Sequence, residues 1–300
     1  MRLVANAPGQ RSPSARTLER QRLMFWLGPP LLWFFVFMIV PYGVLVYYAL
    51  GSVDYLTFTP GVSGENFLKV ATQDPYATVI MRSAKIGLLT ALCSSVVAYP
   101  LAFYMAFHVS SARARATLYI LVMLPWWASY LVKAYAWKTI LGTKGILNET
   151  LLALGLIDVP MTFFLYNQFS MVLTLTYIFT PFAVLSIYAQ LERVPQNVLE
   201  AARDMGASDG EIFRKIILPI SVPGLLAGGV ITFSLGFGDF IAAALVGGSD
   251  SVMIASIVIN LMGVAYDWPL GSAIGLVIIG LAAALLSAAN YLEHKTQVRL

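Results

Sequence analysis

Residues 200–219 read EAARDMGASDGEIFRKIILP and lie in the longest charged loop between two hydrophobic segments of the chain. Gly206 suits the left-handed backbone conformation with which many helices end. Ser208 and Glu211 have the spacing of a capping box, in which a serine begins a helix and a glutamate three residues later completes the cap. The stretch therefore predicts two short helices around Gly206.

The first of these helices has a defined start and an apolar side. Pro195 suits the first turn of a helix. The apolar side is made of Val198, Leu199, Ala201, Ala202 and Met205. Small residues such as Ala201 and Ala202 let another backbone approach closely, which favours a docking surface for a partner. The alternative is a solvated loop that packs on its own helices.

The composition excludes an ordinary soluble domain. The 300 residues are 59% hydrophobic and 11% charged, and the mean hydropathy is +0.77. Soluble domains carry about 25% charged residues. So few charges cannot cover a surface that faces water, and the main solvent of this chain must be lipid.

Six segments are long and apolar enough to cross the hydrocarbon core, which takes about 20 residues of helix. We predict an all-α polytopic membrane protein with spans at residues 24–50, 84–107, 116–138, 168–190, 219–246 and 270–292. The third span tolerates Lys133, and the fifth continues past Asp239. The apolar stretch 252–262 is too short for a seventh span, so we expect a partly inserted or surface helix there.

These spans form a transmembrane domain of residues 23–293. The segment 1–22, rich in proline, serine and arginine, predicts a disordered arm, and residues 294–300 form a short tail. Residues 191–218 form the loop between the fourth and fifth spans.

Lysine and arginine predict the orientation, because they gather on the cytoplasmic side of membrane proteins. Most of them fall on one side of the six spans: Arg2, Arg11, Arg16, Arg20, Arg22, Arg113, Arg115, Arg193, Arg203, Arg214, Lys215, Lys295 and Arg299. We therefore expect both termini and the loop 191–218 in the cytoplasm.

The chain carries no motif for catalysis. It has neither a Gly-x-x-x-x-Gly-Lys-[Ser/Thr] phosphate loop nor a His-Glu-x-x-His zinc motif or a nucleophile elbow. With one cysteine and two isolated histidines, no metal site is expected, and we expect no catalytic residue and no cofactor of its own. A channel or scaffold that needs no ATP is a second hypothesis, but it does not explain the loop around Gly206.

The candidate substrate path lies in the third and fifth spans. Charged residues inside a membrane usually serve a function, and Asp239 and Lys133 both fall in the outer part of the bilayer. Asp239 could bind a cationic substrate, pair with Lys133, or lie near the outer interface without a role. For Lys133 we favour a side chain that extends outward to the interface.

Aromatic residues accompany these charges. Trp126, Tyr130 and Lys133 recur at three- and four-residue spacing, so a continuous helix would place them on one face. Trp127 lies beside that face. Packing in the core explains the two tryptophans about as well as the lining of a cavity, in which aromatic faces and a carboxylate suit an organic cation.

The loop identifies a family. Glu200-Ala201-Ala202, three residues, Gly206, nine residues, Ile216, one residue and Leu218-Pro219 resembles the signature loop of permease subunits of type I ABC importers. The six spans with this loop before the fifth are also similar to that fold. The resemblance implies that the two short helices couple the chain to a cytoplasmic ATPase, with Glu200, Ala201, Ala202 and Gly206 as coupling residues. Ile216, Leu218 and Pro219 carry over as the return of the loop to the membrane.

Softer features resemble the spermidine/putrescine branch of these permeases: the arginine-bearing N-terminal arm, Leu124-Pro125-Trp126-Trp127, and Gly238-Asp239-Phe240 followed by residues 245–248. Permeases for ferric iron, thiamine, phosphonate and opines are related. The resemblance implies a multi-pass protein of the bacterial inner membrane that carries a small solute, a polyamine above all. It implies as partners two ATPase subunits that bind ATP and magnesium, a second and related permease chain, an external binding protein and the lipid bilayer, and no nucleic acid.

Overall fold

The computed structural model describes residues 13–54 and 57–297. The elements in chain order are α1 (Pro13–Phe34), the π-helix η1 (Phe35–Ile39), α2 (Val40–Ala49), β1 (Ser52–Asp54), β2 (Thr57–Thr59), α3 (Glu65–Thr72), α4 (Tyr76–Phe107), α5 (Ala112–Trp127), α6 (Tyr130–Leu141), α7 (Ile146–Ala153), α8 (Gln168–Leu191), α9 (Gln196–Asp204), α10 (Asp209–Ile212), the π-helix η2 (Phe213–Ile217), α11 (Leu218–Phe237), α12 (Ile241–Val246), the 3-10 helix η3 (Ser249–Ser251), α13 (Ile254–Gly263) and α14 (Trp268–Gln297). The strands β1 and β2 pair in antiparallel fashion as a small hairpin.

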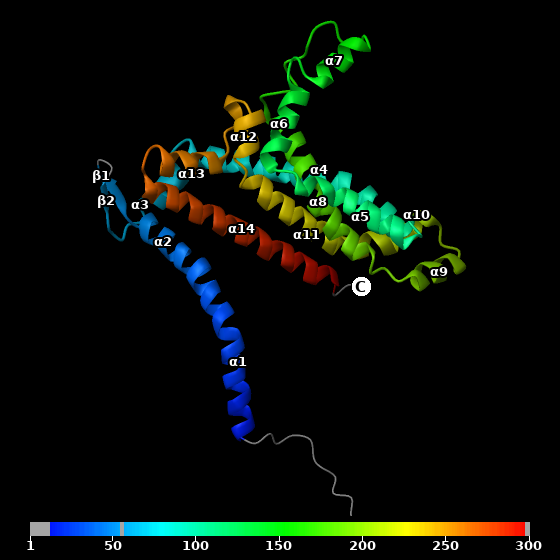
Figure 1. Ribbon diagram of the computed structural model, residues 1–300, viewed down its shortest axis with the longest axis horizontal. Helices are drawn as coiled ribbons and strands as arrows, with labels where there is room; N and C mark the ends of the chain where they lie inside the picture. The colour runs from blue at the N-terminus through cyan, green and yellow to red at the C-terminus, as the bar shows by residue number, and fades with distance from the viewer. Residues whose placement is uncertain (1–12, 55–56, 298–300) are drawn as a thin grey trace, which may run out of the picture.

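Helices α4, α8 and α11 pack together as the centre of a bundle, and α14 lies beside α11 (Figure 1). These helices are apolar, which is what a membrane environment selects. One buried cluster joins Ala102 and Met105 of α4 to Ala183 and Ile187 of α8, and it continues to Leu199 of α9. Figure 1 shows α9 and α10 at one end of the bundle and the β1–β2 hairpin with α13 at the other.

Close contact between α11 and α8 depends on two glycines. A Cβ atom on Gly224 would lie 2.8 Å from the carbonyl oxygen of Ser186, and one on Gly228 would lie 3.1 Å from the Cα of Ala183. Small residues four apart let membrane helices approach in this way. On the same helix, a Cβ on Gly229 would meet no atom within 4 Å.

We expect Gly224→Ala to destabilise the bundle by about 1–3 kcal/mol, because an added methyl group forces apart a packed contact. Gly229→Ala is the matched control and is expected to be neutral, since its position is open. Thermal unfolding of the purified protein in detergent measures both. Equal midpoints for the two variants would contradict the packing described here.

The prediction of a six-span all-α membrane fold is confirmed. Within the described residues, five helices are long and apolar enough to cross a membrane, and a sixth span is counted if α5 and the helices after it are taken as one bent span. The stretch 252–262 contains a short helix, α13, of 10 residues. The predicted arrangement differs from the structure in the continuity of two spans and at both ends of the chain.

The third span is not the single helix predicted for residues 116–138. Helix α5 ends at Trp127, and the chain resumes as α6 at Tyr130 after a bend of 88°. Ala128 and Ser129 have ψ angles of 141° and 138°, which interrupt the helical hydrogen bonds. The fifth span is also broken, because α11 ends at Phe237 rather than continuing to residue 246. Apolar composition predicts that a segment enters the membrane but not that it stays straight.

The ends of the chain are more helical than predicted. Helix α1 begins at Pro13, so residues 13–22 of the predicted disordered arm are helical, and proline suits such a start. Residues 1–12 of that arm lie outside the described residues. Helix α14 continues to Gln297, so the predicted tail 294–300 is largely the last turn of a helix, and 298–300 also lie outside the described residues.

The first span stands apart from the bundle. Figure 1 shows α1 extending away from the bundle, while α2 packs on α14. There, the rings of Tyr48 and Trp268 lie 5.6 Å apart. No residue from 24 to 44 is buried within the chain. A row of exposed phenylalanine and tryptophan side chains requires lipid or another protein as a neighbour.

Candidate functional site

The loop around Gly206 has the predicted geometry. Gly206 has φ +85°, the left-handed region that glycine adopts without strain. Its N–H donates to the carbonyl of Arg203 at 2.8 Å, and the N–H of Ala207 donates to the carbonyl of Ala202 at 3.0 Å. This pair of hydrogen bonds is the Schellman ending of a helix. The turn therefore stops α9 and redirects the chain.

The capping box at Ser208 is also formed. The Ser208 hydroxyl accepts from the N–H of Glu211 at 3.4 Å, and the Glu211 carboxylate accepts from the N–H of Ser208 at 3.2 Å. Lys215 pairs with the same carboxylate at 3.0 Å. Lys215, followed by the hydrogen bonds from Ser208, lowers the pKa of Glu211 to about 2. A depressed carboxyl pKa stabilises the cap above the ordinary pKa of 4.5, and that stabilisation is lost progressively as pH falls from 4.5 through about 2. The cap is therefore intact at neutral pH.

The two-helix prediction implied that the second helix of the loop ends before the membrane. The structure differs, because this helix continues into the fifth span. Helix α10 continues through η2 into α11 as one helical segment of 29 residues, Asp209–Phe237. Ile216 lies within η2 and packs on the buried cluster, and Leu218 and Pro219 begin α11. The turn at Gly206 is thus joined rigidly to the fifth span.

The loop residues divide into an exposed set and a buried set. Glu200, Ala201 and Gly206 are exposed, and Met205 is 82% exposed beside them. Ala202 is buried, together with Leu199, in the cluster that includes α4 and α8. One face of α9 therefore packs on its own bundle, while the opposite face is open, and the docking role of that open face stays a prediction.

The break in the third span and the break in the fifth span are joined by a hydrogen bond. Asp239 follows the end of α11, and Tyr130 begins α6. The Tyr130 hydroxyl donates to Oδ2 of Asp239, and Oδ1 of Asp239 accepts from the N–H of Ala242 at 2.8 Å. Asp239 is only 7% exposed. Its carboxylate thus caps α12 and holds the start of α6 beside it.

Sequence reasoning identified Asp239 and Tyr130 but not their pairing. Their separation of 109 residues gives no local pattern to read. The pairing of Asp239 with Lys133, one of three alternatives, is not observed, because no ion pair of the described residues involves either side chain. Lys133 is 7% exposed, so its side chain is buried rather than extended outward as we predicted.

The predicted aromatic face is also interrupted. Trp126 and Tyr130 lie on opposite sides of the 88° bend, so the stripe that a continuous helix would form does not exist. Trp126 packs edge to face on Phe182 of α8, with ring centroids 5.3 Å apart. Trp127 is 89% exposed and free to meet a partner or a solute. The aromatic residues therefore surround the break instead of lining one helix.

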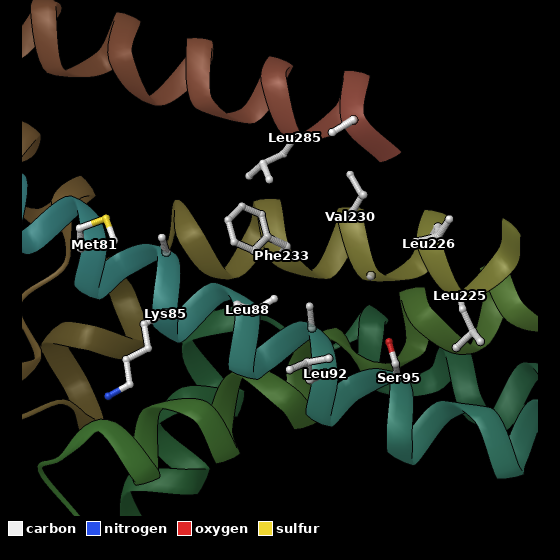
Figure 2. A pocket seen from close by; sticks show the side chains of 14 residues that line it. Met81, Lys85, Leu88, Leu92, Ser95, Leu225, Leu226, Val230, Phe233 and Leu285 are labelled. Atoms are coloured by element: carbon white, nitrogen blue, oxygen red, sulfur yellow. The ribbon is translucent and has the colours of Figure 1, made fainter. Parts of the chain in front are cut away.

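A large apolar groove among the described residues lies elsewhere. It has a volume of about 840 Å³ and runs between α4, α11 and α14. Figure 2 shows Leu285 of α14 above Phe233 and Val230 of α11, while the amine of Lys85 points away from α14. None of the path residues predicted from sequence lines this groove. Its apolar walls suit a lipid chain or an apolar helix.

An apolar helix bundle with broken spans and a capped loop at one end defines a polytopic membrane protein. Residues 98–298 match the family described as "Binding-protein-dependent transport system inner membrane component". The chain belongs to this family, and it is a permease subunit of the ABC importer type. In such systems the ATPase is a separate subunit. Membership of this family favours the permease over the hypothesis of a channel or scaffold that needs no ATP.

Two curated relatives cover most of the chain. The inner membrane ABC transporter permease protein YdcU of Escherichia coli (strain K12) is 33% identical over 92% of this chain and 94% of its own length. The spermidine/putrescine transport system permease protein PotB of the same organism is 30% identical over 88% of this chain and 96% of its own.

A solved structure shares the fold. The bacterial alginate ABC transporter in complex with its alginate pentasaccharide-bound periplasmic protein aligns with a TM-score of 0.72. The alignment covers 93% of this chain and 96% of that chain, at 18% identity. The type I importer permease fold is thus confirmed, and the protein is a multi-pass component of the inner membrane.

Proposed function

We propose that this chain forms, with a second permease chain, the translocation path for a small organic cation of the polyamine class. The observation that carries the proposal is the buried Asp239 carboxylate beside Tyr130 at the meeting of the two broken spans. A carboxylate near exposed aromatic faces attracts ammonium groups. The relative PotB, whose name states spermidine and putrescine transport, supports the same solute class.

The loop is the proposed contact with the ATPase. Glu200, Ala201 and Gly206 offer an exposed surface, and Ala202 anchors that surface to the bundle. Ile216, Leu218 and Pro219 connect it to the fifth span. This assignment places the loop and both termini in the cytoplasm, in agreement with the lysine and arginine distribution. Two ATPase subunits, one for each permease chain, complete the proposed importer complex.

The cycle follows from this arrangement. A solute-loaded binding protein docks on the outer loops, roughly residues 51–80, 141–167 and 247–270. The ATPases close on ATP and pull the 195–217 helices, which tilts the attached spans and opens the cavity outward. Hydrolysis returns the bundle to its inward-facing state. Such rigid-body motion suits helices that are continuous through the loop, as Asp209–Phe237 is.

A second candidate solute is an anion such as a phosphonate. Lys133 is buried on α6 close in sequence to Tyr130, and a buried ammonium group would repel a polyamine. The same cation would attract a phosphonate group. Ferric iron, thiamine and opines have no specific observation in their favour.

The test is a purified complex in vesicles. We expect ATPase subunits and a second permease to co-purify with this chain, and the reconstituted complex with its binding protein to take up putrescine or spermidine. Uptake of 2-aminoethylphosphonate without uptake of polyamines would contradict the polyamine proposal and favour an anionic solute instead. Failure of any ATPase to co-purify would contradict the coupling role of the loop.

A further inference from the structure

Three side chains join the start of the third span to the end of the fourth. Arg115, in the first turn of α5, lies with its guanidinium 3.8 Å from the carboxylate of Glu192. The Tyr188 hydroxyl of α8 donates to that same carboxylate at 3.1 Å. Arg115 also donates to the carbonyl of Val109 at 2.9 Å, so its position is fixed from two sides.

This contact is partly enclosed on the side of Arg115. The side chain of Arg115 is 33% exposed and that of Glu192 53% exposed. The Nε atom of Arg115 is fully buried and has no hydrogen-bond partner among the described residues. The rings of Tyr119 and Tyr188 pack across the same two helices at 6.3 Å. Arginine holds a fixed planar geometry better than lysine does.

One end of the contact belongs to the base of the loop. Glu192 is the residue that caps the end of α8, and Pro195, three residues later, caps the start of α9. Between them, Val194 is buried in the same hydrophobic cluster as Leu199 of α9. A displacement of α9 therefore moves the chain around Glu192 with it.

The other end of the contact belongs to a half-span. Helix α5 has 16 residues and ends at Trp127, where the third span bends. Beyond the bend, Tyr130 holds Asp239. A helix that is held at one end and hinged at the other transmits a displacement of its first turn to the hinge.

We propose that Arg115 and Glu192 are positioning residues that transmit movement of the loop to α5 and so to the Tyr130–Asp239 contact. The proposal rests on the coupling role of the loop given above. Tyr188 orients the Glu192 carboxylate. The fourth and fifth spans are attached to the loop through the backbone, whereas the third span is attached to it through this side-chain contact.

The experiment measures the distance between α5 and α4 in the assembled complex. Spin labels replace Leu124 of α5 and Val97 of α4, both exposed, after Cys93→Ser removes the exposed native thiol. The distance is compared without nucleotide and with ATP plus orthovanadate. This readout needs no knowledge of the transported solute.

We expect ATP with vanadate to shift the Leu124–Val97 distance, and Arg115→Ala to reduce that shift at least twofold. Glu192→Gln keeps the acceptor for Tyr188 but removes the charge, and it should reduce the shift by a similar amount. Combining the two changes should cost no more than either alone. Arg113→Ala, at an exposed position two residues away, is the matched control and should leave the shift unchanged.

Exchange of the two charges, Arg115→Glu with Glu192→Arg, should restore at least half of the shift, because it re-forms the contact between α5 and α8. An unchanged shift in Arg115→Ala would overturn the proposal, as would a double variant whose losses multiply. Those outcomes leave the coupling role of the loop intact. If instead the unmodified complex binds no ATPase, that result contradicts the coupling role proposed for the loop, and not the Arg115–Glu192 proposal alone.

Discussion

Gly206→Asp is expected to abolish ATP hydrolysis stimulated by the loaded binding protein, a loss of at least tenfold, while membrane insertion stays normal. Two effects combine. The backbone at Gly206 has φ +85°, where most residues with a side chain cost about 1–2 kcal/mol and aspartate costs less. The new carboxylate would also be desolvated in the contact with the ATPase, which costs several kcal/mol unless a partner compensates.

Two further variants separate these effects. Asparagine tolerates the left-handed region and carries no charge, so Gly206→Asn should retain most of the activity. Gly210→Ala lies in the helical segment that follows, where a Cβ would meet no atom within 4 Å. It should be neutral or slightly stabilising, because alanine favours helix more than glycine does. Stimulated ATPase activity in vesicles is the measurement, and normal coupling in Gly206→Asp would sink the assignment of the loop.

Asp239→Asn is expected to reduce polyamine transport at least tenfold at unchanged expression. An asparagine can still cap α12, and the Tyr130 hydroxyl can accept from its amide group. The substitution therefore removes the charge and keeps the shape. A hydrogen bond or contact to a charged group contributes about 1.5–3 kcal/mol, and about 1.4 kcal/mol corresponds to a tenfold change.

Two companions distinguish a solute-binding carboxylate from a structural one. Tyr130→Phe removes the hydroxyl but leaves the charge, so a cation site should keep most of its transport rate. Asp239→Ala removes both the charge and the cap and should lower stability as well as transport. The measurement is the initial rate of spermidine uptake into vesicles. If Asp239→Asn transports normally while Asp239→Ala fails, the carboxyl group serves only to hold α6 and α12.

Much of the fold could be predicted because its signals are local. Gly206, Ser208 and Glu211 specify a helix end and a helix start within six residues, and the structure forms both. Long apolar runs predicted the membrane spans, since the transfer of such runs into lipid depends on composition and length alone. The loop spacing from Glu200 to Pro219 identified the family, which the match over residues 98–298 confirms.

The candidate site was predicted only as a set of residue types. Asp239, Tyr130 and Lys133 were each singled out as polar groups in apolar surroundings, but their geometry was not accessible. A straight third helix would have aligned Trp126 with Tyr130, whereas the extended backbone at Ala128 and Ser129 separates them. Apolar composition does not distinguish a straight span from one that breaks, because both bury the same side chains.

The amino-acid sequence by itself determined the class of the protein, its apolar spans and the capped turn at Gly206, because each depends on neighbours a few residues apart. Only the tertiary structure decided that Tyr130 meets Asp239, that Ala202 is buried while Ala201 is exposed, and that Arg115 reaches Glu192. Those contacts join residues that are distant in the chain or divide adjacent ones between two faces. The two side-chain contacts are set by the packing of α5 and α6 against α8 and α12, and the burial of Ala202 is set by the packing of α9 on α4 and α8. No short stretch of sequence encodes either.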